Sequence, residues 1–326
     1  MATTYNLKEI ANKFAKKQAA EMVDDLTEET PILERCRWEP ASHNLWNMGE
    51  KVSDITGAGW TDADEALSNM NVSSTLIKTD LTVLGGEMEQ AEDTVDQFGG
   101  AAAYFAKKEP LILKQAGMDT EAKLYYDNWF AKALADGNAV NAGSTAATTY
   151  SIVIVRMAAG ENAGLFDPTG FVQGSLLKRA LINNGARYHL RSKTGVLGYG
   201  VTLKGRFGWQ NLSTKSVGVI ANIDASNLPT AIEIDNLLSD VRARPETTMI
   251  LMHPKCKALA INGFKASSVQ AGITTIAGVT EALTASALQM NVMDTKYNRI
   301  IDYWNNIPII TSYNIKDGTE AYTTTI

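Results

Sequence analysis

Apolar residues recur at helical spacing in the segment PTAIEIDNLLSDVRAR. They stand at i, i+3, i+4 and i+7, which places them on one face of a helix: Ile234, Leu237, Leu238 and Val241. Thr230 and Glu233 precede most of this run with the three-residue offset of a capping box. The pattern predicts a packed helix that begins near Thr230.

The N-terminal segment shows the same spacing and predicts an amphipathic helix. Leu7, Ile10 and Phe14 share one helical face, and most of the lysines lie on the other side. At Thr30 we expect the chain to turn extended, because a residue before a proline avoids the α region. The segment up to Pro40 is therefore predicted to be an arm and not part of the core.

A longer helical pattern starts near Gln90. Interruptions are expected near Pro110 and Gly117, because both residue types weaken a helix, and the helix should resume in DTEAKLYYDNWFAKALADG. Gly137 is well placed as the C-cap of this second part. The residues from Asn138 to Thr149 are small and polar, and they predict a linker.

A period of two appears in TLIKTDLTV. Ile77, Leu81 and Val83 alternate with polar residues, as in a half-buried strand. The glycine-containing residues 45–74 before it are loop-like, so loop and strand together resemble an extended hairpin. This loop carries Trp60, which is either packed within its own domain or directed at a partner.

Strand signals dominate the second half of the chain. YSIVIVRM and TMILMHP are apolar, β-rich runs that predict buried strands, and the residues up to Ile223 should be mostly sheet with NNGAR as a turn. Pro254 is expected to open a short helix, and residues 265–291 to form a mobile insertion. The apolar run IPIIT, beginning at Ile307, predicts a strand docked into the fold.

Composition places few further limits. The 326 residues, 45% of them hydrophobic, suit one large or two modest domains with a sizeable core. Cys36 and Cys256 are too few for a disulfide framework, and neither a signal peptide nor an apolar run of ~18 residues is visible. We therefore expect a reducing cytoplasm and no membrane span.

Charge is unevenly distributed along the chain. Between Glu50 and Asp96, eleven acidic residues stand against two lysines, a balance of −9. Between Asp167 and Asp224 there are eight lysines and arginines and no acid, a balance of +8. Either each segment is an ordinary solvated face, or the two segments meet, within one chain or between copies.

Motifs for catalysis or cofactor binding are absent from the sequence. There is no phosphate-binding loop, and GVLGYG has neither the spacing nor the context of a dinucleotide fingerprint, so it is read as a turn. His253 and Cys256 form an HxxC pair, but two ligands do not make a zinc site. We predict a protein that is not an enzyme, with no catalytic residues, cofactor or metal.

The order of several segments carries a resemblance. TVLGGEMEQAEDTVDQF, ALADGN, GLFDPTGFVQG, the long basic segment YHLRSKTGVLGYGVTLKGRFGWQNLSTKSVGVIANID, ILMHPKCKALA and IPIITSYNI follow one another as in the major capsid proteins of tailed bacteriophages. The chain resembles this family from about Leu45 to Ile326, and within it the capsid proteins of short-tailed phages most. None of these segments is catalytic.

The resemblance implies an α+β, HK97-like capsid fold with an N-terminal arm, an E-loop, a peripheral domain on a long spine helix, and an axial domain. By it, residues 1–44 are the arm, 45–90 the E-loop and return strand, and 91–148 the peripheral domain. Residues 149–228 are a sheet-rich region assigned to the axial domain or an insertion, and 229–326 complete the axial and peripheral domains. A terminal strand at Ile307 would complete a sheet whose other strands come from far upstream.

The function implied is a shell protein. It would self-assemble as hexamers and pentamers into the icosahedral shell of a virion, assembled in the host cytoplasm around double-stranded DNA held by non-specific contact. Scaffold, portal and cementing proteins are candidate partners, and no membrane is implied. An encapsulin-like compartment, and a soluble binding module or enzyme with no recognisable motif, remain alternatives.

Candidate contacts between copies follow from these segments. The acidic loop offers Trp60, Asp62, Asp64 and Glu65, the basic segment offers Arg187, Arg191 and Lys193, and the arm offers Leu7, Ile10 and Phe14. We hypothesise that the acidic segment of one copy lies against the basic segment of the next, where matched charges would set register. The rival hypothesis is that the basic segment faces packaged DNA.

Overall fold

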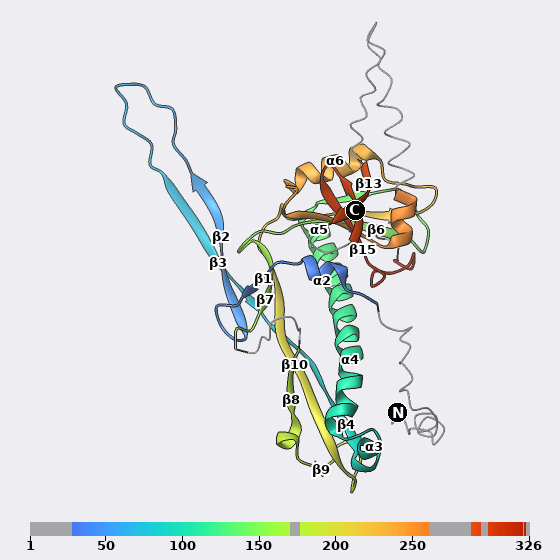
Figure 1. The fold of residues 1–326 in the computed structure, drawn as a ribbon. Helices are drawn as coiled ribbons and strands as arrows, with labels where there is room; N and C mark the ends of the chain where they lie inside the picture. Colours follow the sequence, from blue (N-terminus) through green and yellow to red (C-terminus); the bar gives the residue numbers. More distant parts are fainter. Residues whose placement is uncertain (1–27, 170–176, 261–287, 295–298, 322, 324–326) are drawn as a thin grey trace. The chain divides into compact units, whose positions relative to one another are not determined.

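The computed structural model describes residues 28–169, 177–260, 288–294, 299–321 and 323 (Figure 1). Contacts within the chain divide it into two compact units built from segments far apart in sequence. Among the described residues, unit 1 contains Glu28, Leu84–Ala116 and the described part of Val172–Gly205. Unit 2 contains Glu29–Val83, Gly117–Phe171 and Arg206–Ile326.

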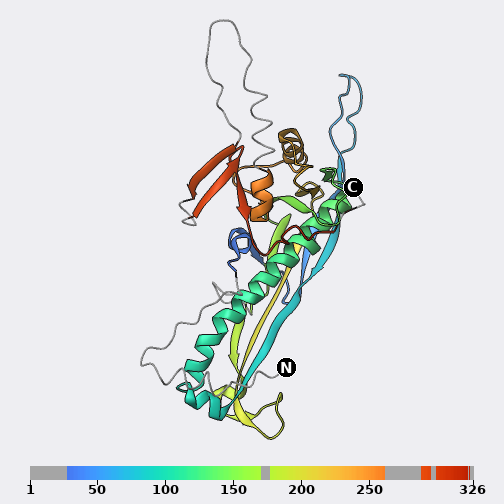
Figure 2. The same ribbon diagram turned by 90° about the vertical axis from the view of Figure 1, so that its right-hand side faces the viewer.

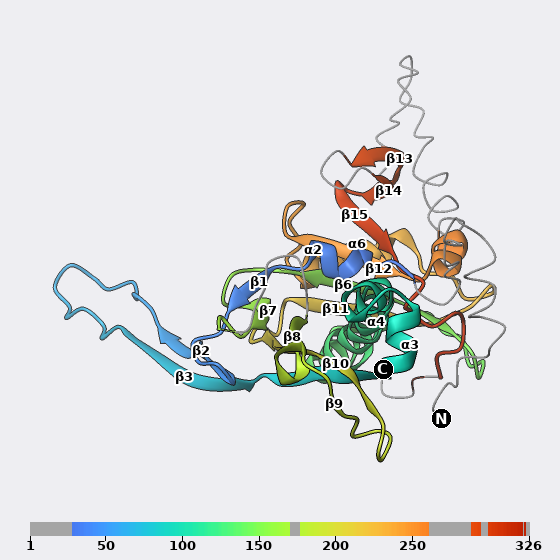
Figure 3. The same ribbon diagram turned by 60° about the horizontal axis from the view of Figure 1, so that its bottom comes forward.

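A seven-stranded sheet forms the centre of unit 2, in the order β13-β14-β15-β12-β6-β11-β5. β15 runs parallel to β12 and antiparallel to β14, and Figure 3 shows β13, β14 and β15 side by side. The predicted strand at Ile307 thus completes a sheet whose other strands include distant upstream segments, as expected. The strands are β5 Ala139–Asn141, β6 Tyr150–Arg156, β11 Val217–Ile223, β12 Thr248–Met252, β13 Leu288–Asp294, β14 Arg299–Trp304 and β15 Ile307–Thr311. β5 lies within residues 138–149, which were predicted to be a linker. The prediction of a linker was therefore wrong for the residues of β5.

The core of unit 2 lies between this sheet and helix α6 Ala231–Asp240. Strands β6 and β11 lie inside the sheet and are buried almost throughout, which explains their continuous apolar runs. The predicted capping box is present: Glu233 N donates to Thr230 Oγ1 at 3.3 Å, and Thr230 N donates to Glu233 Oε2 at 2.7 Å. The four apolar residues of the predicted helical face are all buried. Residues 254–260 are helical, as predicted from Pro254.

The helical segment after Gln90 differs from the prediction. α3 Glu92–Gln97 is followed by α4 Ala101–Lys123, which continues through Pro110 and Gly117, then by the π-helix η1 Leu124–Phe130 and α5 Ala131–Asp136. The break falls instead at Gly99 and Gly100, whose φ angles of 88° and 98° a helix does not allow. A Cβ at Gly117 would lie 3.1 Å from Thr30 Cγ2, so glycine permits close packing there. Gly137 is the left-handed C-cap, as predicted.

The prediction of an extended segment between Thr30 and Pro40 was wrong. Pro31 begins the short helix α2 Pro31–Arg35, because proline has no N–H to lose at a first helical position and its φ already suits a helix. Ile32 and Leu33 are buried. β1 Trp38–Pro40 then runs parallel to β7 Asn162–Phe166, so this segment belongs to the fold of unit 2.

Strand β10 Leu197–Asn211 contributes to both units. In unit 1, its first half pairs with β8 Lys178–Leu181 and β9 Tyr188–His189, and β10 is also a neighbour of β4 Thr82–Ala91. GVLGYG was predicted to be a turn, but only Gly195 has a turn conformation, and β10 starts at Leu197. NNGAR forms the predicted turn within η2 Ile182–Gly185, where both asparagines and the glycine have positive φ.

Two predictions fall outside the described residues. They are the N-terminal helix with Leu7, Ile10 and Phe14, and most of the insertion predicted for residues 265–291, of which only the residues from Leu288 onward are described as part of β13.

Candidate inter-subunit surfaces

The predicted extended hairpin is present in unit 2. β2 Trp46–Thr56 pairs antiparallel with β3 Asn71–Asp80, and residues 57–70 form its tip. Figure 2 shows this two-stranded ribbon in blue and cyan, and among the described residues no third strand pairs with it. Residues 46–56 were expected to be loop-like and are a strand. We name this element the hairpin.

The hairpin carries most of its exposed apolar side chains on one face. Cross-strand partners share a face, and so do alternate residues of a strand. The register therefore gathers five exposed apolar side chains on one face: Met48, Val52, Ile55, Val72 and Leu76. We name them the apolar face. On the other face, Asn47 Nδ2 donates to Gln210 Oε1, and a Cβ at Gly49 would lie 2.5 Å from Leu212. The hairpin root thus packs through one face and leaves the apolar face open.

The tip of the hairpin is equally unpartnered. The Trp60 side chain is 105% exposed and Leu67 86%, so Trp60 is not packed within its own domain. Asp62, Asp64 and Glu65 are exposed, and none forms an ion pair with another described residue. A two-stranded hairpin is marginally stable alone, and exposed apolar patches of this kind mark interaction surfaces.

The arginines of the basic segment are paired within the chain. Arg187 Nη1 lies 3.0 Å from Glu92 Oε1, and Arg191 Nη1 lies 2.9 Å from Glu87 Oε2. Arg179 pairs with Glu109 at 2.8 Å and Arg206 with Asp167 at 3.0 Å. Part of the −9 and +8 charge balance is therefore matched inside one chain, and the hypothesis of pairing between copies needs other bases.

Four lysines of the same segment carry the remaining positive charge. Among the described residues, none of them has an ion pair: Lys178, Lys193, Lys204 and Lys215. In this segment, every arginine has an ion pair within the chain, and no lysine has one with a described residue. Of the predicted contact residues, Arg187 and Arg191 have partners in their own chain, whereas Lys193 does not.

Glu89 is fixed in the same part of unit 1. Its carboxylate accepts hydrogen bonds from Tyr188 Oη at 2.7 Å and from the backbone N–H groups of Ser192 at 2.9 Å and Arg191 at 3.3 Å. Burial alone would raise the pKa of Glu89, but these hydrogen bonds outweigh it and lower the pKa to about 2. Glu89 therefore stays ionised and holds the loop after β9.

A buried carboxylate joins three segments of unit 2. Glu121, on α4, is 0% exposed and accepts hydrogen bonds from the N–H groups of Ile32 at 3.1 Å and Leu33 at 3.2 Å. Ser312 Oγ and Asn314 Nδ2 also bind it. Burial raises the pKa of Glu121 above its ordinary value, although these hydrogen bonds oppose the shift. Sequence reasoning missed this residue, because nothing in the helix around it marks it as buried.

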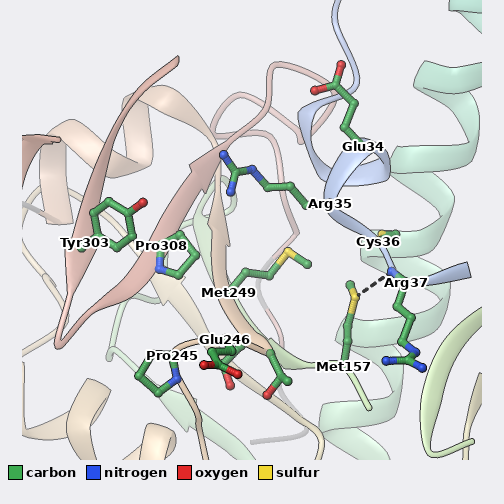
Figure 4. A pocket seen from close by; sticks show the side chains of 12 residues that line it. Glu34, Arg35, Cys36, Arg37, Met157, Pro245, Glu246, Met249, Tyr303 and Pro308 are labelled. Atoms are coloured by element: carbon green, nitrogen blue, oxygen red, sulfur yellow. Dashed lines mark hydrogen bonds between the residues drawn. The ribbon is translucent and has the colours of Figure 1, made fainter. Parts of the chain in front are cut away.

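A cavity of about 560 Å³ lies in unit 2 beside α2 (Figure 4). Its lining combines Met157, Met249 and Pro308 with charged side chains such as Arg37 and Glu246. Cys36 also contributes, but burial raises the pKa of its thiol well above the usual range, so the thiol stays protonated and is a poor nucleophile. The cavity brings together no nucleophile with an activating base.

The HxxC pair is a strand-to-helix junction. His253 Nδ1 accepts from Lys255 N at 3.2 Å, whereas Cys256 Sγ donates to Ser151 O at 3.8 Å, so the two side chains have different partners. Within the described part of the chain, no cluster of three or more potential metal ligands occurs. No helix there has both the length and the apolar character needed to cross a membrane.

The fold has counterparts among solved structures. No protein-family model matches the sequence, and no curated protein matches it. The structure of bacteriophage Epsilon15 matches with a TM-score of 0.59 at 14% identity, over 100% of both chains. The capsid of bacteriophage JBD30 matches with a TM-score of 0.50 at 8% identity, over 80% of this chain and 90% of the other. An encapsulin of Synechococcus elongatus PCC 7942 reaches a TM-score of 0.46 at 11% identity, over 66% of this chain and 95% of the other.

These similarities define the class of fold. The chain has the α+β, HK97-like fold of phage capsid proteins, as the sequence resemblance implied. At these identities the comparison concerns the fold alone. The boundaries of arm, E-loop, peripheral and axial domains stay predictions, as do the contacts between copies.

Proposed function

We propose that this chain is the major capsid protein of a tailed bacteriophage, which self-assembles into an icosahedral shell around double-stranded DNA. The hairpin is the observation that carries the proposal. Its apolar face and its tip have no partner among the described residues of their own chain, and an exposed apolar surface of this kind gains free energy when another molecule buries it. The shared fold with a phage capsid supports a second copy of the chain as that molecule.

The geometry of such a contact favours closed rings. A hairpin that docks on a different surface of the next copy makes a heterologous contact, and repeated heterologous contacts close into rings when the rotation permits. Hexamers and pentamers are rings of this kind. Each copy would then both insert one hairpin and receive one.

The domain assignments belong to the same proposal. The hairpin lies within residues 45–90, assigned to the E-loop, and α4, η1 and α5 lie within residues 91–148, assigned to the peripheral domain with its spine helix. The seven-stranded sheet takes β5 from residues 91–148 and its other strands from 149–228, assigned to the axial domain or an insertion, and from 229–326, assigned to complete the axial and peripheral domains. Scaffold, portal and cementing proteins, non-specific contact with packaged DNA, and assembly in the host cytoplasm into a virion capsid complete the proposal.

The test is assembly of the purified chain. Negative-stain microscopy and sedimentation velocity over a range of protein concentrations should show rings or closed shells above a threshold concentration. A monodisperse monomer at every concentration, with or without a co-expressed scaffold protein, contradicts the proposal. The encapsulin-like alternative predicts native particles that hold a cargo protein in place of DNA, which gel analysis of their contents distinguishes.

A further inference from the structure

Two lysines of unit 1 stand opposite each other on adjacent strands. In the antiparallel pairing of β8 with β10, Lys178 is the cross-strand partner of Lys204. Both are exposed, and neither has an ion pair in the described part of the chain. Like charges directly opposite each other destabilise a strand pair. The arrangement is therefore unfavourable, and no acid among the described residues pairs with either lysine to offset it.

Strand alternation places this pair on the face of the strands away from α4. The next residues along, Arg179 and Leu203, are also cross-strand partners, and they point to the opposite face. On that opposite face Arg179 Nε donates to Glu109 of α4, at 2.8 and 3.0 Å. Lys178 and Lys204 thus lie on the other side, which we name the open face.

The hairpin tip has the complementary charge. Asp62, Asp64 and Glu65 lie within four residues of one another, are exposed, and have no cationic partner among the described residues. The arginines of the basic segment are already neutralised by acids of their own chain. After internal pairing, the open face retains a concentrated positive charge and the tip a concentrated negative one.

We propose that the Lys178–Lys204 pair on the open face receives the acidic hairpin tip of a second copy of this chain. The proposal rests on the proposed function and names the surface that the hairpin contacts. Carboxylates between the two ammonium groups would remove their repulsion, so the strand pair becomes more stable in the assembly than in the single chain. Charge pairs of this kind set the register and rate of association.

A zero-length carbodiimide cross-link tests the contact directly, because it joins only a carboxylate and an amine that touch. Shells assembled from an equal mixture of ¹⁵N-labelled and unlabelled chains are cross-linked and digested. Mass spectrometry should find peptides with Lys178 or Lys204 joined to Asp62, Asp64 or Glu65, with mixed labels. Shells in which these lysines are joined to no tip acid, or only to the tip of their own chain, overturn the proposal.

Charge reversal gives a second test. The Lys178→Glu/Lys204→Glu variant should raise the threshold concentration for assembly by about tenfold or more, equivalent to about 1.4 kcal/mol. Adding Asp62→Lys, Asp64→Lys and Glu65→Lys should lower the threshold again. The matched control is Lys123→Glu/Lys215→Glu, which changes the net charge equally at two other exposed lysines without an ion pair among the described residues and should change the threshold little.

The outcomes separate this inference from the proposed function. If the unmodified chain forms shells and the Lys178→Glu/Lys204→Glu variant assembles at the same threshold as its control, the inference fails and the shell function stands. If that variant forms empty shells normally but retains less DNA, the lysines contact DNA and the inference also fails. A far-ultraviolet circular dichroism spectrum equal to that of the unmodified chain confirms that the variant is folded.

Discussion

The hairpin and the seven-stranded sheet are both β-structure in unit 2, but they use apolar residues in opposite ways. In β6, five consecutive residues from Ser151 to Val155 are buried, and strands on both sides together with α6 cover them. In the hairpin, Leu76 is 68% exposed and its strand has one neighbour. Apolar side chains in the sheet are buried on folding and stabilise the subunit. Those in the hairpin stay exposed in the subunit, and their burial can stabilise an association.

The largest expected effect separates a core leucine from a hairpin leucine. Leu238→Ser removes packed methyl groups from the core beside α6 and buries a hydroxyl, which should lower the free energy of unfolding of the unassembled subunit by about 3 kcal/mol or more. Leu76→Ser should change it by about 0.5 kcal/mol or less, and raise the assembly threshold instead. Urea unfolding and light scattering measure the two quantities, and equal unfolding losses in both variants would contradict the distinction.

Glu121→Ala should be nearly as costly to unit 2. It leaves the buried N–H groups of Ile32 and Leu33 without an acceptor, at about 1–3 kcal/mol each. Because the folded pKa of Glu121 is raised, its contribution to stability is complete below its ordinary pKa of 4.5 and is lost as pH rises through the raised value. Urea unfolding should show that the difference in free energy of unfolding between the unmodified chain and Glu121→Ala becomes smaller as pH rises over that range. Asp62→Ala, an exposed carboxylate, is the control, and an equal deficit there would refute the role of burial.

Trp60→Ser should affect assembly alone. A tryptophan anchor at an interface contributes ~2 kcal/mol or more, so the assembly threshold should rise about 30-fold, with no shift in the urea midpoint. Thr61→Ser, at the next position, should leave both unchanged. A lower urea midpoint for Trp60→Ser would place the indole in the folded core and not at an interface.

Lys178→Glu should stabilise the subunit while it weakens assembly. It converts a like-charge cross-strand pair with Lys204 into an opposite-charge pair, a gain of about 0.2–1 kcal/mol. The urea midpoint should therefore rise as the assembly threshold rises. Lys193 is not among the residues that pair with β10. Lys193→Glu should therefore give no rise in the urea midpoint. A lowered midpoint for Lys178→Glu would show that the lysine pair is not a strain on the fold.

The smallest effect concerns Glu89→Gln in unit 1. The folded pKa of Glu89 is depressed to about 2, so its contribution is present above its ordinary pKa of 4.5 and is lost as pH falls toward 2. Thermal unfolding of the two proteins should differ by under about 1 kcal/mol at neutral pH, because solvent screens the carboxylate, and should converge near pH 2. A difference that stays constant from pH 7 to pH 2 would remove the carboxylate charge as its cause.

Sequence reasoning succeeded where the signal is local. The capping box of α6, the left-handed Gly137 and the apolar run of β15 each depend on a few adjacent residues. It failed where packing decides. α4 runs through Pro110, and the short helix at Pro31 is fixed by the burial of Ile32 and Leu33, which no local pattern reveals.

The candidate surfaces were only half visible in the sequence. Trp60 and its acidic neighbours could be found because they are a local cluster. The division of the bases into paired arginines and free lysines could not, because Arg191 and Glu87 are 104 positions apart and their pairing requires the fold. The apolar face was hidden as well, since the five side chains come together only through the register of β2 with β3.

The parallel pairing of β12 with β15 has a consequence for biosynthesis. A ribosome makes β6, β11 and β12 well before the residues of β15, and parallel partners separated by a long connection pair late. Until Ile307–Thr311 emerge, the edge of β12 that β15 will cover presents unpaired N–H and C=O groups to neighbouring nascent chains. The chain is therefore most prone to aggregate in the interval between the synthesis of β12 and that of β15, and slower elongation after β12 lengthens that interval.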